Sequence, residues 1–364
     1  MRKVRLYLLF CLLWPLSAAA QGGDVMLLPS GGETDVPASP DTADRRYCPP
    51  RITGMSPARF VTIGWDWQLP YTAEFSPIGS YKKDEGAPVA ESGRIRSTQG
   101  LRLSASIPVI ARERVVWQLG FNFWNLTYDA ETTLQTPESA GLLTQLNDNG
   151  LRTAGLNTTV FKPLGEKQFL ILQGAADLSG DYSLKKFQKP RYLRYSVAAV
   201  WGKRPHDRMQ WGLGLSRTYR AGQANIFPVV MFNWTAPNRK WGTEILLPAR
   251  AHLRRTFSAK NFLLAGYELE GQSYRIHELS DAERSLEIRR GELRARLEYQ
   301  RQLSGFIWIA LQAGYRFNWS FNADYLPDDG KDFSRGFSGN QPYAMLNAPG
   351  NAPYFNVSLN VVRP

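Results

Sequence analysis

The sequence predicts an all-β protein: a transmembrane antiparallel up-and-down β-barrel of fourteen strands, with twelve as the alternative. Two observations predict this fold. Apolar and polar residues alternate in segment after segment, and the links between the segments are alternately short and long. In an extended strand successive side chains point to opposite faces, so each segment has one apolar and one polar face. After residue 20, no apolar run approaches the roughly 20 residues of a membrane-spanning helix. A helical membrane protein is therefore excluded.

The first 20 residues have the pattern of a signal peptide. A basic start, "MRKVR", precedes the apolar stretch "LYLLFCLLWPL", and "SAAAQ" supplies small residues for cleavage. We expect export and cleavage near Ala20, which lowers the formal net charge of +12 by three. Cys11 leaves with this peptide, so Cys48 is the single mature cysteine. A fold held by intramolecular disulfides is excluded.

Residues 21–57 are rich in Gly, Pro, Ser and Asp and show no sustained periodicity. We expect a flexible N-terminal periplasmic segment. The pattern changes at Phe60, and we assign residues 58–364 to one barrel domain.

Alternation begins in "FVTIGWDWQL" at 60–69, where Val61, Ile63 and Trp65 share one face and Thr62, Gly64 and Asp66 share the other. The stretch "QFLILQGAADL" at 168–178 is ambiguous in phase. Clear copies follow the first segment at 101–109, 115–123, 156–160, 193–201, 209–215, 230–234, 241–247, 263–269, 293–299, 307–319 and 355–361.

The links between these segments form two classes. Short links are expected at 111–113, 164–167, 202–207, 236–240, 258–260 and 303–305. Mostly longer polar links alternate with them, at about 70–93, 128–150, 179–191, 221–225, 275–285 and 321–352. Outer-membrane barrels have short periplasmic turns and longer extracellular loops, so the short links are assigned to the periplasm.

The strand count depends on residues 240–257. One strand there gives thirteen, whereas a reversal near Pro248, which has no N–H to donate, gives fourteen. The alternation of Ile245, Leu247, Ala249 and Ala251 runs straight through the proposed turn. Twelve strands stay open as the alternative.

Segment length favours a bilayer over a soluble core. Most segments reach about 9 residues, the length that a tilted strand needs to cross the hydrocarbon layer, whereas strands of soluble proteins average about 5–6. Trp and Tyr gather near the segment ends, as aromatic girdles do. A secreted β-sandwich also alternates and is the remaining alternative, although it does not explain the sorting of the links.

Charged residues lie on the face opposite the apolar one, which a barrel turns towards its lumen. The expected lumen-lining residues are Glu244, Arg250, Arg254, Glu292, Arg294, Arg296, Glu298 and Arg316. One interpretation is that these charges pair and hold the barrel closed. The other is that the arginine excess lines a water-filled path that favours anions.

No catalytic or cofactor pattern is present, and we expect neither enzymatic activity nor a cofactor. The three histidines, His206, His252 and His277, are far apart, and none lies two residues from a serine. No metal-ligand set or phosphate-binding loop occurs. The basic residues are spread without interleaved stacking aromatics, so nucleic acid is not an expected partner.

From 58 to 364 the chain resembles outer-membrane β-barrel proteins of Gram-negative bacteria. The likeness is to an uncharacterised family with a signal peptide, a polar lead-in, a "W-x-x-E-x-L-L-P" element, here 241–248, and a last strand like "YFNVSLNVV". The resemblance implies location in the outer membrane, with its lipids, lipopolysaccharide and the barrel-assembly machinery as partners. Many barrels end on an aromatic residue that this machinery recognises. This chain ends "VVRP", and we expect Phe355 to serve in place of that terminal aromatic residue.

The polar inner face and the chain length together predict a pore or passive transporter for small solutes, whose identity the sequence does not give. The alternative is a structural or ligand-binding barrel that acts through its long outer loops, especially 321–352.

Overall fold

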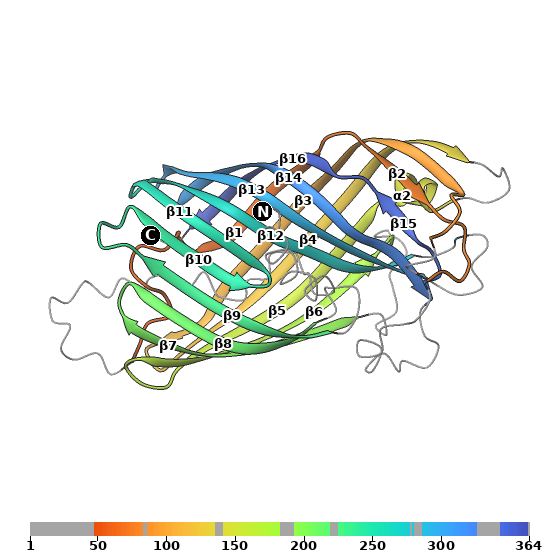
Figure 1. Ribbon diagram of the computed structural model, residues 1–364. Helices are drawn as coiled ribbons and strands as arrows, with labels where there is room; N and C mark the ends of the chain where they lie inside the picture. Colours follow the sequence, from red (N-terminus) through yellow and green to blue (C-terminus); the bar gives the residue numbers. More distant parts are fainter. Residues whose placement is uncertain are drawn as a thin grey trace, which may run out of the picture.

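The computed structural model describes residues 47–82, 86–134, 141–182, 193–218, 225–276, 279, 286–325 and 343–362. The predicted signal peptide, 1–20, lies outside them. Within the described chain each barrel strand pairs antiparallel with its neighbours, and β1 (Arg59–Gln68) pairs with both β3 (Glu91–Arg112) and β16 (Ala352–Val362), which closes the sheet (Figure 1). The other barrel strands are β4 (Val115–Leu134), β5 (Leu151–Pro163), β6 (Gln168–Gly180), β7 (Arg194–His206), β8 (Met209–Thr218), β9 (Asn225–Thr235), β10 (Trp241–Leu247), β11 (Arg250–Ser258), β12 (Asn261–Ile276), β13 (Leu286–Ser304) and β14 (Ile307–Tyr325).

The prediction of fourteen barrel strands is confirmed for the described residues, and twelve is wrong. Two further strands, β2 (Tyr71–Phe75) and β15 (Asn347–Pro349), pair with each other and prolong β1 and β16. The chain reverses after β10, where Leu246 pairs with Arg250. Residues that pair across two strands point to the same face of the sheet, and these two are an even number of positions apart in the sequence. The alternation of apolar and polar residues therefore continues through the turn without a break.

The connections are sorted by end of the barrel, as predicted. Six short ones, at 113–114, 164–167, 207–208, 236–240, 259–260 and 305–306, lie at one end and define the short-turn end, whereas the short turn 248–249 lies at the opposite end. The opposite, long-loop end holds β2, β15 and the helix α2 (Leu142–Asn149) (Figure 1). Two expectations fail there: β3 begins at Glu91 and β4 runs to Leu134, inside the predicted links 70–93 and 128–150. At the long-loop end β3 and β4 therefore extend beyond the belt of apolar residues that faces lipid.

The outer face of the barrel is an exposed belt of large apolar side chains. Leu156 is 66% exposed, Leu215 61% and Ile107 59%. Others in the belt are Ile63, Trp65, Leu119, Phe121, Leu172, Val197, Leu213, Leu253, Leu297, Leu311, Val357 and Leu359. Water-soluble monomers rarely expose a contiguous apolar patch of more than a few hundred Å². A closed sheet also leaves no backbone edge unpaired in hydrocarbon, so this fold suits a bilayer.

The barrel narrows at the long-loop end. β6 pairs with β7 as far as Asp177, and β12 pairs with β11 as far as Glu268. Beyond these points β6 and β12 meet directly, through the bridge between Gly180 and Arg275. A hydrogen bond from Gln272 to Ser179 joins the same strands across the interior. The narrowed part is therefore formed by the strands that extend beyond the β6–β12 bridge, without β7 to β11.

Candidate functional site: the barrel interior

The structure places the eight charged residues of the sequence analysis on the inner face. Glu292 and Glu298 are fully buried, and Arg254, Arg294 and Arg316 are at most 3% exposed. The side chains of Glu244 and Arg296 are 14% and 9% exposed, and Arg250 lines an internal cavity. All eight therefore face the interior.

Ion pairs cross the interior at mid-barrel. Asp66 of β1 pairs with Arg102 of β3 and, at 3.1 Å, with Arg294 of β13. Glu270 of β12 lies 2.7 Å from the Arg102 guanidinium and 3.0 Å from that of Arg294. Asp66, Arg102 and Glu270 were not among the site residues predicted from the sequence. Because Asp66 and Arg102 lie on polar faces that alternation had already assigned, the same criterion would have found them.

Glu292 is the centre of a second group. Its carboxylate lies 2.6 Å from Arg290, 3.1 Å from Arg316 and 3.3 Å from Arg294. Arg290, which the sequence analysis also left out, is 2% exposed. Glu292 shares these guanidinium groups with other carboxylates, since Arg294 also pairs with Asp66 and Arg290 lies 3.5 Å from Glu270. A buried charge is tolerated only when it is paired in this way.

A third group lies nearer the short-turn end. Arg296 holds both oxygens of Glu268 at 2.6 Å and contacts Glu298 at 3.0 Å. Glu298 also pairs with Arg59, and Arg254 lies 2.9 Å from Glu244. Of the two interpretations of the inner charges, this geometry favours pairing across the barrel.

Aromatic rings lie among the arginines. The Arg102 guanidinium lies 3.8 Å from the ring centre of Trp124, and Arg290 lies 4.7 Å from it. Arg294 similarly lies 4.9 Å from the ring of Tyr354. Such cation–π contacts are strongest away from water, and they hold the guanidinium groups in place between the polar layer and the apolar long-loop end.

Two adjoining cavities lie among these side chains. Their volumes are about 70 Å³ and about 110 Å³. They share the lining residues Arg59, Thr62, Ser104, Glu268 and Arg296. A cavity volume of about 10–15 Å³ is enough for one water molecule, so each cavity holds several water molecules and no large solute.

The N-terminal segment lies inside the barrel at the short-turn end. Cys48 donates its backbone N–H to Gly165 at 2.9 Å, and Thr53 donates to Asp207 at 2.8 Å. Arg204 donates to the carbonyls of Pro49 and Arg51, at 3.0 Å and 2.6 Å. The flexible segment predicted for 21–57 is thus wrong for its described part, 47–57. We call residues 47–57 the docked segment.

Two further contacts hold the docked segment in the lumen. Ser56 donates its N–H and hydroxyl to the Glu244 carboxylate, at 2.9 Å and 2.6 Å. Cys48 is buried in an apolar cluster on the inner face with Phe161, Phe169, Ile171, Val200, Val229, Met231 and Leu246. Phe169 and Ile171 belong to the stretch of ambiguous phase: both of its faces are apolar at this end, because the inner one packs on the docked segment.

We expect Cys48 to react slowly with maleimide at pH 8 in the folded protein. Burial raises the pKa of its thiol to about 11, so the reactive thiolate is depleted. At pH 8 such a thiol is about one-thousandth ionised, against about a quarter for an ordinary one, which predicts a rate roughly two hundred times lower. The control is Ser304→Cys, at an exposed position of the same end, in a Cys48→Ser background. Equal rates would show that the docked segment is not held.

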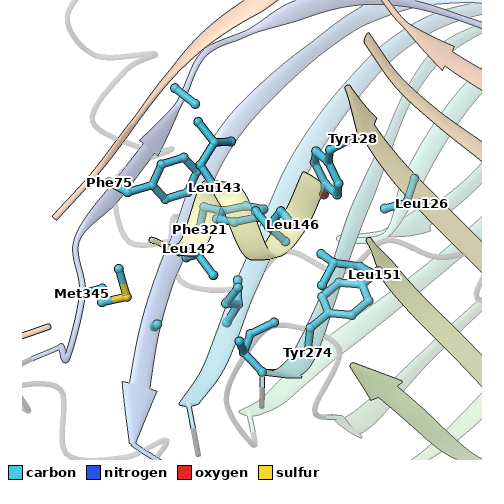
Figure 2. Close-up of a cluster of buried hydrophobic side chains, with 14 of the residues drawn as sticks. Phe75, Leu126, Tyr128, Leu142, Leu143, Leu146, Leu151, Tyr274, Phe321 and Met345 are labelled. Atoms are coloured by element: carbon cyan, nitrogen blue, oxygen red, sulfur yellow. The ribbon is translucent and has the colours of Figure 1, made fainter. Parts of the chain in front are cut away.

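An apolar core closes the long-loop end. Figure 2 shows Leu142, Leu143 and Leu146 of α2 among Phe75, Tyr128, Tyr274 and Phe321 of the surrounding strands. The sequence analysis placed a loop here and missed α2. Leu143 and Leu146 are fully buried, so the helix forms to fill the narrowed barrel rather than from strong local signals.

Polar contacts fix both ends of α2. Glu91 of β3 accepts from the backbone N–H of Leu143 at 2.8 Å and of Thr144 at 3.1 Å, which satisfies free donors at the positive helix end. At the other end Gly150 has φ 63°, a left-handed conformation that suits glycine, and donates to Leu146 at 2.9 Å. Two more contacts join the helix to the wall: the Ala130 N–H of β4 donates to Asn147 at 2.9 Å, and Gln145 donates to the Asp181 carboxylate at 3.0 Å.

The described residues contain no group of three or more His, Cys, Asp or Glu side chains that could hold a metal ion. His252 is 5% exposed, with its Nε2 3.7 Å from Glu268, and His206 lies at the short-turn end. His277 lies outside the described residues. In the part of the chain that the structure describes, no helix is long and apolar enough to span a membrane.

A closed fourteen-stranded sheet with an apolar outer belt and a charged interior defines a transmembrane β-barrel. Residues 68–361 match the family described as Domain of unknown function (DUF6268), and the chain belongs to this family. The uncharacterised barrel family that the sequence resembled is thereby confirmed. A comparison with curated protein sequences finds no match.

Several solved structures are distantly similar. The COG4313 outer membrane channel from Pseudomonas putida F1 is 10% identical, with 88% of this chain and 99% of that chain covered and a TM-score of 0.36. The Pseudomonas putida toluene transporter TodX is 8% identical, with 95% of each chain covered and a TM-score of 0.32. The outer membrane protease OmpT from Escherichia coli is 8% identical, with 84% of this chain and 96% of that chain covered and a TM-score of 0.27. At these scores the similarities do not bear on function.

Proposed function

We propose that the protein is an outer-membrane channel for small solutes that the structure describes in a closed state. The observation that carries this proposal is the pair of adjoining polar cavities at mid-barrel, which lie between the docked segment and the apolar core around α2. We treat these two elements as non-covalent closures. A polar, charge-lined lumen is the usual solute path of a barrel. Each closure is a segment joined to the wall by hydrogen bonds and packing, so it can leave without breaking the barrel ladder.

Placement in the outer membrane is part of the proposal. The exposed apolar belt needs lipid around it, and a closed sheet is the β-structure that spans a bilayer. Outer-membrane lipids, lipopolysaccharide and the barrel-assembly machinery are the proposed partners. On the last strand Phe355 and Val357 lie on the outer, exposed side, where an assembly factor would meet them.

The second candidate is a sealed barrel that acts through its outer loops. Its supporting observation is that arginine–carboxylate pairs join strands across the interior, as between Asp66 and Arg294. Most of the loop singled out for binding, 321–352, lies outside the described residues, at 326–342.

Conductance across planar bilayers tests the two candidates in a design with four proteins. These are the mature wild type, a chain that starts at Ala58, the variant Leu143→Ser/Leu146→Ser, and the combination of both changes. The truncation removes the docked segment, and the serines loosen α2. We expect rare openings in the wild type, more in each single change, and sustained conductance when both closures are weakened.

Folding of each protein is checked by the shift in gel mobility between unheated and boiled samples. If all four are folded and the bilayers stay sealed, the channel proposal fails and the sealed barrel is favoured. If the truncation alone conducts as well as the combination, α2 is not a closure.

A further inference from the structure

Basic residues are concentrated at the short-turn end. In segments 110–116, 162–168, 203–209, 235–241, 255–261 and 300–307, nine exposed Lys or Arg side chains stand against three exposed Asp or Glu. The long-loop end is mixed, and charges there pair with one another, as in Arg194 with Glu287 at 3.2 Å and Arg289 with Asp324. Among the described residues, the excess of exposed positive charge therefore lies at the short-turn end.

Three of these exposed residues, and one half-buried arginine, lie on the rows that face lipid, not in the turns. Lys162 on β5, Lys203 on β7, Arg255 on β11 and Arg301 on β13 each stand two positions beyond an outward-facing apolar or aromatic residue. We call these four residues the basic girdle. Two positions along a strand are about 6.6 Å, which moves a side chain from the edge of the hydrocarbon to the headgroups.

Aromatic rings accompany the basic girdle. The Lys203 ammonium lies 5.5 Å from the ring centre of Trp201, which packs edge-on against Trp211 at 5.9 Å. Arg255 lies 4.6 Å from the ring centre of Trp241, its cross-strand partner. Trp rings prefer the interface between hydrocarbon and water, so they mark the depth at which the basic groups sit.

We propose that the basic girdle binds the phosphate groups of anionic phospholipids, such as phosphatidylglycerol, in the leaflet at the short-turn end. Lys and Arg stems lie along apolar surface while their charged ends reach a headgroup phosphate. A water-soluble partner would meet the turns, whereas the girdle points into the lipid. Lipopolysaccharide is the other phosphate source, and short turns face away from its leaflet.

Quenching of tryptophan fluorescence by brominated lipids measures this preference in reconstituted protein. Vesicles contain equal phosphatidylglycerol and phosphatidylcholine, with one or the other brominated. The girdle variant is Lys162→Gln/Lys203→Gln/Arg255→Gln/Arg301→Gln. The control removes the same charge from the turns, as Lys167→Gln/Arg239→Gln/Lys240→Gln/Lys260→Gln.

We expect wild type to prefer phosphatidylglycerol by about fivefold at low salt, the ratio that one basic group near a headgroup supports. The preference falls towards one in 1 M NaCl, because screening then acts within a few ångströms. It is lost in the girdle variant and kept in the turn control. Equal preference in wild type and girdle variant overturns the proposal. So does an effect seen with lipid A in the vesicles and absent with phosphatidylglycerol.

Discussion

Replacement of Glu292 by alanine is expected to lower the free energy of unfolding by about 3–5 kcal/mol, the usual cost of breaking a buried ion pair. Glu292 is fully buried and lies within 3.3 Å of Arg290, Arg294 and Arg316. The alanine variant leaves three buried guanidinium groups without this carboxylate. Urea unfolding in phospholipid vesicles, followed by tryptophan fluorescence, measures the change.

The matched control is Glu131→Ala. Glu131 also pairs with an arginine, Arg96, but the two side chains are 55% and 57% exposed at the long-loop end. Exposed pairs contribute little because water solvates both partners. A similar small effect for both variants would mean that water reaches the Glu292 group, and that the interior is open rather than closed.

Leu146→Ala is expected to loosen α2 while the barrel stays folded. Leu146 is fully buried in the core of the long-loop end, and truncating a buried leucine costs about 2–5 kcal/mol. Because α2 is held by packing and by Glu91, we expect this substitution to lower the free energy of local opening of α2 and to leave the barrel strands unaffected. At the lower figure, hydrogen exchange of the α2 amides accelerates about thirtyfold or more, since about 1.4 kcal/mol is tenfold.

Asp148→Ala, at an exposed position of the same helix, is the control and should leave exchange nearly unchanged. Strand amides of β12 and β13 report on the barrel. If they accelerate together with α2 in the Leu146→Ala variant, the helix is part of one cooperative unit with the wall, and it is not a separable closure.

Much of the wall was predictable from the sequence because the two-residue period is local. Alternation assigned Arg294, Arg296 and Arg316 to the polar face, and a closed sheet turns that face inward. Link lengths assigned the two ends of the barrel. The reversal near Pro248 was harder, since Leu246 and Arg250 are four positions apart and alternation continues through the turn.

The contents of the barrel were not predictable in this way. Asp66 and Arg294 are 228 positions apart and meet because the sheet closes, which no local pattern encodes. The docked segment has a composition typical of flexible chain, and it is held by partners such as Gly165 in a turn and Glu244 on β10, which lie far away in the sequence.

The sequence by itself therefore determined which side of each strand meets lipid, because that choice is made residue by residue. Only the tertiary structure decided that α2 and the docked segment lie inside the barrel and that charges pair across its middle. The physical reason is that the diameter of the ring and the narrowing between β6 and β12 set the distances across the lumen, and these distances decide which charges and apolar side chains can touch.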